Sequence, residues 1–321
     1  MPARKSAPMV AVVCGATRGA GRGAARALGE VGAIVYCTGR STRDARSAYQ
    51  RPETIDETAE MVNAAGGTGI PVRVDHAEEH QVREFFERVG REQKRLDVVV
   101  DSVAGEDPVY GTWAPLWTAD FSQATTAFTQ GLVTRIHTAK YAGTLLRKRK
   151  RGLIVQVTGA DFPFYGGNLV HDLVMFGHKG LAFYLAEELR SAKVASVAIT
   201  PGFLRSEAML THFGVTEANW REGAQKDKYF AHSESPLLIG RAIVALAGDS
   251  DVMRWSGHLT SSWEVASEYG LVDHDGNNPD WGTAWRDVMV EQAPMRTGTE
   301  RQVEWLERVS GRLRGYLERV D

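Results

Sequence analysis

The sequence predicts an α/β fold in which helices cover both faces of a parallel sheet of about seven strands. Short apolar runs alternate along the chain with longer segments that carry helical signals, and this alternation is typical of a doubly wound sheet. The runs are apolar throughout, as strands covered on both faces should be. A glycine-rich turn follows the first run, at the position where such sheets bind phosphate groups.

The expected elements follow one another in chain order without an internal repeat. The expected strands cover residues 9–14, 33–38, 70–74, 96–100, 153–157, 194–199 and 255–260. The first expected helix runs to about residue 29, and the later helices cover residues 52–66, 78–92, 117–147 and 171–192. For the helix after the second strand, Pro52 and Glu53 mark the start and Gly66 marks the end.

One domain is expected to account for most of the chain. Residues 1–8 are expected to form a flexible tail, residues 9–280 a single domain, and residues 281–321 a C-terminal helical extension. The spacing of aliphatic residues between 303 and 317 predicts an amphipathic helix that packs on the body of the protein or on a second subunit. Large apolar side chains in residues 207–235 predict a lid over a substrate, with a packed pair of surface helices as the alternative.

Composition and charge exclude several classes of partner. The chain has 321 residues, a formal net charge of −2, 43% apolar residues and 24% charged residues. A nearly neutral chain has no global field that attracts nucleic acid or a membrane surface, so we expect neither partner. We find no secretory signal and no apolar run of the ~18 residues that a membrane span needs, so we expect a cytoplasmic protein.

Cys14 and Cys37 are expected to be buried thiols. The His and Cys residues lack the spacing of metal ligands, so we expect no metal.

Three glycines give the first turn a geometry that suits a dinucleotide. Gly15 lets the chain turn sharply, Gly19 lets the backbone approach a pyrophosphate, and Gly21 lets the following helix pack against the sheet. The free amides at the start of the helix then face the phosphate charge. A turn with a purely structural purpose is the alternative, but the strand before the turn and the helix after it favour nucleotide binding.

The residues after the second strand indicate which dinucleotide binds. Proteins that bind NAD place an acid there for the ribose hydroxyls, whereas this chain has Gly39, Arg40 and Ser41. Arg18 lies in the glycine turn, so two guanidinium groups can converge on a 2′-phosphate. The loop up to Arg51 adds further arginines. The pattern predicts NADPH, and in the alternative interpretation Arg40 is an ordinary solvated residue.

These motifs resemble the short-chain dehydrogenase/reductase superfamily. The Thr-Gly-x-x-x-Gly-x-Gly turn of that superfamily matches residues 14–21, with Cys in place of Thr, and its Thr-Gly-Arg strand end matches residues 38–40. Over residues 9–280 the chain is most similar to the branch typified by dehydrogenase/reductase family member 1. The resemblance implies a Rossmann-type fold, a small-molecule substrate and a homo-oligomer, dimer or tetramer, paired through the helices over residues 117–147 and 171–192.

The resemblance also implies which further residues hold NADPH. Asp75 would hold the adenine amino group with His76 beside it, and residues 103–105 would leave room for a ribose. A Pro-Gly turn would seat the nicotinamide carboxamide, with Ser206 in place of the Thr of the family. The full set expected to bind the cofactor is Gly15, Thr17, Arg18, Gly19, Ala20, Gly21, Gly39, Arg40, Ser41, Asp75, His76, Val103, Ala104, Gly105, Pro201, Gly202, Phe203 and Ser206.

The chain departs from the superfamily at the catalytic residues. The family has a Ser after the fifth strand and a Tyr-x-x-x-Lys pair in the next helix. Aligned on the Glu-Leu that ends this helix, the Tyr falls at His171, the Lys at Met175 and the Ser at Thr158. An alternative register puts Lys179 at the Lys, but Met175 then replaces the Tyr and the helix ends no longer match. Lys179 is also about 12 Å from His171 along the helix axis, so we do not expect it to replace the family Lys.

Two classes of enzyme fit these observations. The first is an atypical NADPH-dependent reductase of a ketone, enone or imine of a mid-sized metabolite, in which Thr158 holds the substrate and His171 supplies the proton. Asp161, Tyr165 and Asp172 are the other candidates for the proton donor. The second is a cyclase, isomerase or lyase with NADP(H) structural or absent, which the loss of the Tyr-Lys pair favours. A regulatory or scaffold protein that binds the cofactor is the remaining alternative.

Overall fold

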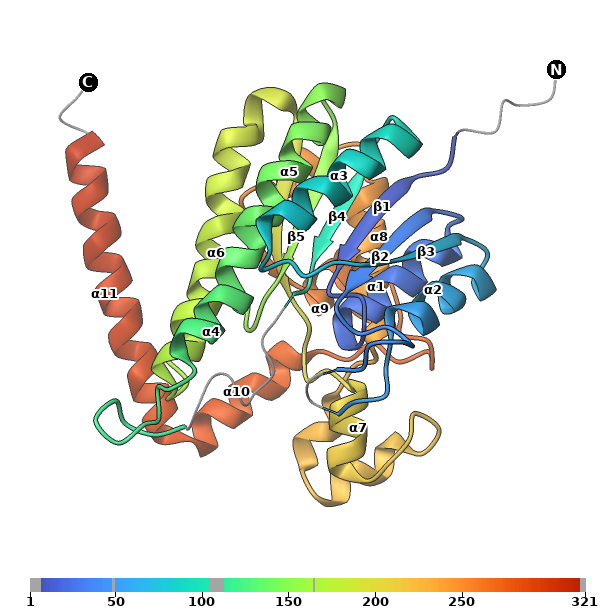
Figure 1. Cartoon of the computed structure of the whole chain (residues 1–321). Coiled ribbons are helices and arrows are strands. Elements are labelled where there is room, and N and C mark those ends of the chain that lie inside the picture. The colour runs from blue at the N-terminus through green and yellow to red at the C-terminus, as the bar shows by residue number, and fades with distance from the viewer. Residues whose placement is uncertain (1–6, 48–49, 104–112, 164, 318–321) are drawn as a thin grey trace.

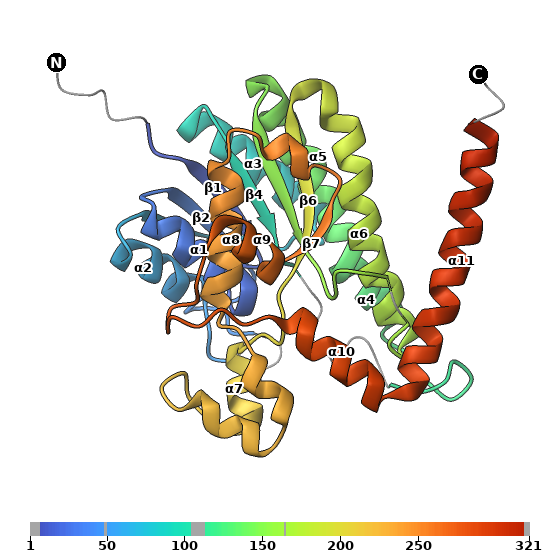
Figure 2. The ribbon, with the colours of Figure 1, turned by 180° about the vertical axis from the view of Figure 1, so that it is seen from behind.

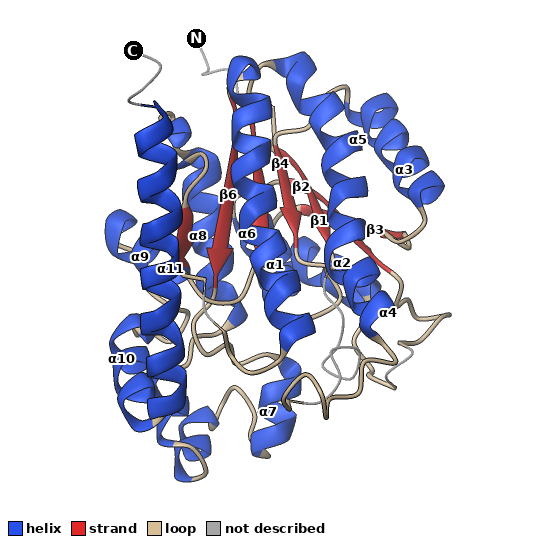
Figure 3. Ribbon diagram, turned by 90° about the vertical axis from the view of Figure 1, so that its left-hand side faces the viewer, coloured by secondary structure: helices blue, strands red, loops and turns tan. Residues whose placement is uncertain are grey.

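A single parallel sheet forms the centre of the protein. The computed structural model describes residues 7–47, 50–103, 113–163 and 165–317. Seven strands lie in the order β3-β2-β1-β4-β5-β6-β7, and helices cover both faces of the sheet (Figure 1, Figure 3). This arrangement confirms the predicted doubly wound α/β fold.

The strands are short, and the central ones are buried. They are β1 (Val10–Cys14), β2 (Ile34–Gly39), β3 (Thr68–Arg73), β4 (Val98–Asp101), β5 (Gly152–Val157), β6 (Val194–Thr200) and β7 (Leu259–Ser261). Every residue of β1, β4, β5 and β6 is buried, because helices exclude water from both faces. Cys14 and Cys37 are buried free thiols, as predicted.

The helices form two layers and a group at the edge of the sheet. One layer contains α1 (Gly19–Glu30), α2 (Ile55–Ala64), α8 (Pro236–Gly248) and α9 (Ser262–Tyr269). The other contains α3 (Glu79–Gln93), α4 (Ala124–Phe128), α5 (Thr134–Arg149) and α6 (Leu169–Leu189). Beyond the carboxyl ends of the strands lie α7 (Glu207–Phe213) and α10 (Trp281–Glu291), and α10 leads into α11 (Ala293–Leu317) (Figure 3). Among the described helices, none has both the length and the apolar character that crossing a bilayer requires.

Close backbone contact fixes α1, whose first turn faces the site. A Cβ built on Gly23 would lie 1.8 Å from the carbonyl oxygen of Pro236, so only glycine lets α1 and α8 approach this closely. At the neighbouring helix α2, Thr54 and Glu57 form a reciprocal capping box, which satisfies two backbone N–H groups at the helix start. Backbone contacts and a side-chain cap therefore hold α1 and α2, the helices beside the glycine turn, in place.

The helix expected over residues 117–147 begins later and is not regular. Its first turn is α4, which starts at Ala124, and a π-helical turn over Thr129–Val133 separates α4 from α5. Before it, the side chain of Asp120 accepts a hydrogen bond from the backbone N–H of Ser122 at 2.8 Å. Because a short polar side chain that bonds a nearby backbone amide competes with helix formation, this stretch forms turns instead.

The last strand is shorter than residues 255–260. A 3₁₀ turn ends at Trp255, Gly257 has a positive φ of 87°, and only Leu259–Ser261 pair with β6. The backbone therefore turns at Gly257 before the strand can begin.

The C-terminal extension consists of two helices, α10 and α11, where the sequence predicted one amphipathic helix. α11 is the outermost helix in both views (Figure 1, Figure 2). Its aliphatic side chains at Val303, Leu313 and Leu317 are 48%, 60% and 62% exposed. The expectation that this face packs on the body of the protein is therefore wrong, and packing on a second subunit stays a prediction.

Candidate active site

Three hollows lie at the carboxyl edge of the sheet and share walls. The glycine-turn hollow, of about 420 Å³, is lined by the first turn and the end of β2. The central hollow, of about 730 Å³, shares Val157 and Pro201 with it. A third hollow of about 240 Å³, here named the tryptophan pocket, shares Thr158 and His171 with the central hollow. Ligands of doubly wound sheets bind at this edge, so the three hollows form one candidate site.

Most of the predicted cofactor residues line these hollows. They are Gly15, Thr17, Arg18, Ala20, Gly39, Arg40, Asp75, His76, Val103, Pro201, Gly202, Phe203 and Ser206. Ser41 is buried behind the hollow, where its carbonyl accepts a hydrogen bond from the N–H of Ile55 at 3.0 Å. Ala104 and Gly105 lie outside the described residues.

The glycine turn has a shape that fits a dinucleotide. Gly15 has a φ of +76°, and a Cβ on it would lie 2.6 Å from the carbonyl oxygen of Ser102. A Cβ on Gly21 would lie 2.2 Å from the carbonyl oxygen of Gly15. Because side chains are excluded here, a ligand in the hollow can come close to the backbone at the start of α1, where Ala20 lines the hollow and the helix dipole would attract a pyrophosphate.

Glu207, the first residue of α7, places a carboxylate at this same helix start. Its Oε2 accepts a hydrogen bond from the backbone N–H of Gly19 at 2.8 Å, and its Oε1 lies 3.5 Å from Nη1 of Arg22. The contact shows that the start of α1 attracts negative charge. A phosphate that used the Gly19 amide would have to displace Glu207. Reasoning from the sequence missed this contact, because 188 positions separate the two residues.

The arginines predicted to hold a 2′-phosphate lie around one hollow. Arg18 and Arg40 both line the glycine-turn hollow. Nε of Arg18 is 3.4 Å from Oε2 of Glu53, and Nη2 of Arg51 is 2.6 Å from Oε1 of the same carboxylate. Glu53 therefore holds two guanidinium groups beside the hollow, and the residues fit the cationic site that a 2′-phosphate needs.

His76 stabilises the fold and also lines the glycine-turn hollow. Its Nε2 is 2.8 Å from Oγ1 of Thr38, and its Nδ1 is 3.0 Å from Oγ1 of Thr138. Burial lowers the pKa of His76 to about 4, so the ring is neutral at neutral pH. The ring thus ties the end of β2 to α5. Its neighbour Asp75 lines the hollow and accepts a hydrogen bond from the N–H of Ala77 at 3.0 Å.

Arg135 is a buried cation at the ends of β4 and β5. Its Nη1 donates to the carbonyl of Asp101 and to Oε1 of Gln156, both at 2.9 Å, and its Nη2 donates to the carbonyl of Val103 at 2.9 Å. The side chain of Arg135 is 1% exposed and borders the central hollow. These bonds hold the two strand ends at a fixed separation beside the site.

The three positions that the sequence predicts to match the family's catalytic residues lie together. Oγ1 of Thr158 is 3.4 Å from the carbonyl oxygen of Met175 and 4.0 Å from its sulfur. Nδ1 of His171 is 3.2 Å from Oδ1 of Asp172, which orients the imidazole ring. The side chain of Asn168 caps α6 by accepting from the N–H of His171 at 3.0 Å. His171 is therefore held at the first turn of α6, facing the tryptophan pocket.

The structure separates the other predicted proton donors. Asp161 lines the tryptophan pocket, and burial together with the charge of Glu264 raises the pKa of its carboxyl, while Lys179 opposes that rise. Tyr165 is 48% exposed and is not among the residues lining the three hollows. Thr158, Asp161 and His171 are thus brought together, and Tyr165 is not.

Lys179 lines the tryptophan pocket although the sequence reasoning set it aside. It follows His171 and Met175 at intervals of four residues, so all three share one face of α6 and border this pocket. Burial lowers the pKa of Lys179 to about 8, against the attraction of Asp172 and Asp161. Lys179 does not line the other two hollows, so of the three it borders only the tryptophan pocket. The spacing of four was the signal that could have indicated it.

Aromatic side chains from distant segments close the pocket. Phe162 follows β5, Trp263 belongs to α9, and Trp281 and Trp285 lie one turn apart on α10. The rings of Trp281 and Trp285 have centroids 6.0 Å apart, and those of Phe162 and Trp285 are 6.2 Å apart. The C-terminal extension is therefore part of the site, and no motif or spacing in the chain indicates this.

A buried carboxyl supports the Pro-Gly turn from behind. Oε2 of Glu234 accepts hydrogen bonds from the N–H of Gly202 at 3.1 Å and from the hydroxyl of Ser262. Burial raises the pKa of Glu234 to about 8, so its protonated form dominates at neutral pH. The carboxyl holds the turn beside Trp281, whose Cβ lies 2.7 Å from where a Cβ on Gly202 would be.

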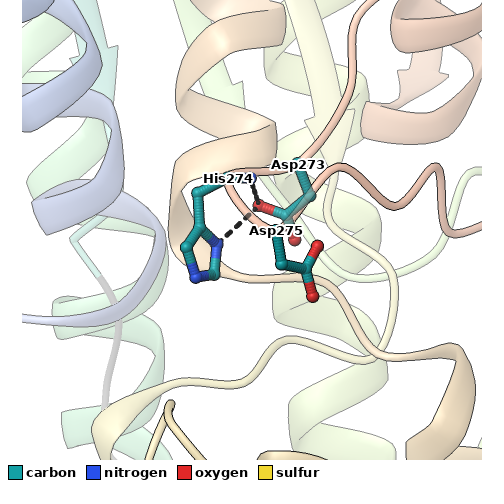
Figure 4. Close-up of side chains that lie close together, drawn as sticks. All are labelled: Asp273, His274 and Asp275. Atoms are coloured by element: carbon teal, nitrogen blue, oxygen red, sulfur yellow. Dashed lines mark hydrogen bonds and ion pairs between the residues drawn. The ribbon is translucent and has the colours of Figure 1, made fainter.

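A cluster of two acids and a histidine lies outside the three hollows. Asp273, His274 and Asp275 bring possible ligand atoms close together (Figure 4). However, Oδ2 of Asp273 is 3.4 Å from Nη2 of Arg205 and accepts from the N–H of Ser235 at 2.7 Å. Because the buried guanidinium of Arg205 already balances these acids, we assign the cluster a structural role.

Comparison with known proteins identifies the family. The family model described as Enoyl-(Acyl carrier protein) reductase matches residues 15–254. The human protein named Dehydrogenase/reductase SDR family member 1 is 33% identical over 278 residues, which cover 84% of this chain and 86% of that protein. The chain belongs to the short-chain dehydrogenase/reductase family. Members of this family are NAD(P)-dependent oxidoreductases, so the resemblance found in the motifs is confirmed at the level of the family.

Solved structures share the fold of this short-chain dehydrogenase/reductase. A short-chain dehydrogenase from Mycobacterium thermoresistibile superposes with a TM-score of 0.69 at 17% identity, over 85% of this chain and 94% of the other. An NADPH-dependent reductase involved in bacilysin biosynthesis gives 0.64 at 18% identity, over 79% and 96%. A metagenomic short-chain oxidoreductase in complex with NADP gives 0.58 at 23% identity, over 76% and 92%.

Proposed function

We propose that this short-chain dehydrogenase/reductase uses NADPH to reduce a ketone, enone or imine of a mid-sized metabolite. The observation that carries the proposal is the continuity of the hollows. The Pro201–Gly202 turn, which would seat the nicotinamide, borders both the central hollow and the tryptophan pocket. A dinucleotide along the first two hollows would therefore end where a substrate in the third begins.

The chain's own residues supply the binding of the cofactor. The start of α1 suits the pyrophosphate once Glu207 releases the N–H of Gly19, and Arg18 and Arg40 suit the 2′-phosphate, which is the basis for preferring NADPH to NADH. Glu234 keeps the Pro201–Gly202 turn in place through the N–H of Gly202. When bound, NADPH supplies the hydride, which is the difficult part of the chemistry.

On the substrate side, polar groups are few and well placed. The hydroxyl of Thr158 can donate a hydrogen bond to the reacting oxygen or nitrogen of the substrate. His171, oriented by Asp172 at 3.2 Å, can deliver a proton to the same atom. The aromatic walls contributed by α9 and α10 exclude water from the reacting centre, which strengthens these contacts.

A non-redox cyclase, isomerase or lyase is the second candidate. The observation that favours it is Met175, an uncharged side chain beside Thr158 where the family places the Lys that holds the nicotinamide ribose. Without that cation, NADP(H) could serve a structural purpose alone.

Isotope transfer distinguishes the two functions. Candidate ketones, enones and imines are incubated with the protein and NADPH that carries deuterium at the transferable position, and the products are weighed by mass spectrometry. Reduction gives a product one deuterium heavier and one oxidised cofactor per product, because the hydride comes from the cofactor. A product isomeric with its substrate, without deuterium and without oxidation of NADPH, would abandon the reductase in favour of the second candidate.

A further inference from the structure

The walls of the tryptophan pocket suit a flat cation. Phe162, Trp263, Trp281 and Trp285 line it together with Asp161 and Asp172. Aromatic faces carry negative charge density and attract organic cations, most strongly where water is excluded. A ligand with a flat apolar body and a positive charge would use both kinds of wall.

The tryptophan pocket is lined by two acids and one lysine. Asp161 and Asp172 share the described lining with one lysine, Lys179, and with His171. Within the described part of the chain, neither Asp161 nor Lys179 has an ion pair shorter than 4.0 Å. Burial raises the pKa of Asp161 and lowers that of Lys179 to about 8. A bound cation would stabilise the Asp161 carboxylate and would make Lys179 release its proton more easily.

The missing Tyr-Lys pair points in the same direction. A ketone needs a proton on its oxygen as the hydride reaches its carbon, and an acid in the site normally supplies it. An iminium ion needs none, because its nitrogen already carries the positive charge. The family's acid would therefore be dispensable for an iminium substrate, and His171 and Met175 stand where that pair is expected.

We propose that the substrate of this site is an iminium ion with a flat apolar body, a protonated or N-alkylated C=N bound in the tryptophan pocket. The inference rests on the proposed function, because it takes the hydride from NADPH. The iminium carbon accepts the hydride with its two electrons, and the C=N π pair becomes a lone pair on nitrogen. The products are a neutral amine and NADP⁺, and the protein gives up no proton.

Binding without the cofactor tests the selectivity of the pocket alone. The probes are N-methyl-3,4-dihydroisoquinolinium, a permanent iminium cation, and 1-tetralone, a neutral ketone of the same ring size. Calorimetry should show the cation binding at least about tenfold more tightly, since carboxylates and aromatic faces both favour it. Titration of the cation in buffers of different ionisation enthalpy should also show release of protons near pH 7 from Lys179. Equal or tighter binding of 1-tetralone would overturn the inference.

Variants assign the selectivity to named groups. Asp161→Asn should weaken binding of the cation about fivefold or more while leaving that of 1-tetralone within about twofold. Asp287→Asn is the matched control, because Asp287 is an exposed acid on α10 that is not among the residues lining the pocket. If Asp287→Asn weakens the cation as much as Asp161→Asn does, the attraction is a general effect of charge and the inference fails.

Turnover with NADPH separates this inference from the proposed function. With N-methyl-3,4-dihydroisoquinolinium, kcat/KM should rise as the pH passes about 8, because Lys179 then loses its charge. A fall of kcat/KM over the same range would indicate that an acid supplies a proton, and would overturn the inference. Selective binding of the cation with no oxidation of NADPH would support a cation pocket and contradict the reductase.

Discussion

Replacing Glu207 by Gln should tighten the binding of NADPH. The carboxylate of Glu207 accepts a hydrogen bond from the backbone N–H of Gly19 at 2.8 Å and lies 3.5 Å from the guanidinium of Arg22. A pyrophosphate at the start of α1 competes for the same amide and is repelled by the same carboxylate. The variant Glu207→Gln keeps the size and the hydrogen-bonding oxygen of the side chain but removes its charge.

The magnitude follows from the kind of hydrogen bond that must be broken. A hydrogen bond to a charged group contributes about 1.5–3 kcal/mol, and a neutral one about 0.5–1.5 kcal/mol. Displacing the neutral side-chain amide of the variant should therefore cost about 1–1.5 kcal/mol less than displacing the carboxylate, which corresponds to an affinity about tenfold higher. The gain is expected for NADPH and for NADH alike, since both contain the pyrophosphate.

Calorimetric titration of the wild type and the variant measures this difference. The control is Glu222→Gln, because Glu222 lies in the same 207–235 segment but contacts Asn219 at 3.1 Å and not α1. Hydrogen exchange of α7 should also change when NADPH binds to the wild type, as the Glu207 contact is released. An unchanged or weaker affinity of Glu207→Gln for NADPH would refute the competition, and so would an equal gain in Glu222→Gln.

Three further outcomes follow from other parts of the structure. Arg40→Ala should weaken the binding of NADPH by about 1.5–3 kcal/mol and leave the binding of NADH unchanged. Calorimetry checks this, and equal affinity of the wild type for both cofactors would contradict it. Burial raises the pKa of Glu234 from 4.5 to about 8, so between these values the folded state holds more protons than the unfolded state, and stability should fall as the pH rises toward 8. Glu234→Gln should lose this slope in urea unfolding at several pH values, and parallel slopes would argue against the assignment. The exposed Phe183 and Tyr184 of α6 predict a dimer of about twice 35.3 kDa in sedimentation, which Tyr184→Glu should dissociate; a wild type that sediments only as a monomer would exclude it.

The fold could be predicted from the sequence because its strands are buried on both faces. Runs such as Val10–Cys14 and Val194–Thr200 contain almost no polar residues, so apolar content alone located them. The predicted ends of helices and strands were less accurate where a local contact or turn competes with the expected element. The Asp120 side chain favours a turn over helix, and Gly257 delays the last strand.

The two halves of the candidate site differ in how far the sequence could predict them. The glycine turn is local: Gly15, Gly19 and Gly21 act on the same few backbone atoms, so their spacing carries the information. The tryptophan pocket joins segments that are more than a hundred residues apart, Phe162 with Trp285 among them, and no spacing in the sequence encodes such a meeting.

Lys179 shows a different limit of sequence reasoning. The distance of about 12 Å along the axis is a distance between backbone positions. Helical side chains slant toward the N-terminus, and a lysine has a long flexible stem. The side chain of Lys179 can therefore line the same pocket as His171, although its Cα lies two turns away.

The uncharged side chain of Met175 and the C-terminal helix α10 are physically connected. The sequence aligns Met175 with the family's Lys, so an uncharged side chain lies beside Thr158, and an open, wet pocket would then offer a substrate little electrostatic guidance, because water screens charges strongly. α10 closes the pocket with Trp281 and Trp285, so the carboxylates of Asp161 and Asp172 act in a drier environment where each charge has a larger effect. If α10 were removed by ending the chain before residue 281, selectivity between charged and neutral ligands should therefore decline more than the affinity for NADPH. The glycine turn and the arginines, which line the glycine-turn hollow, would hold most of the dinucleotide.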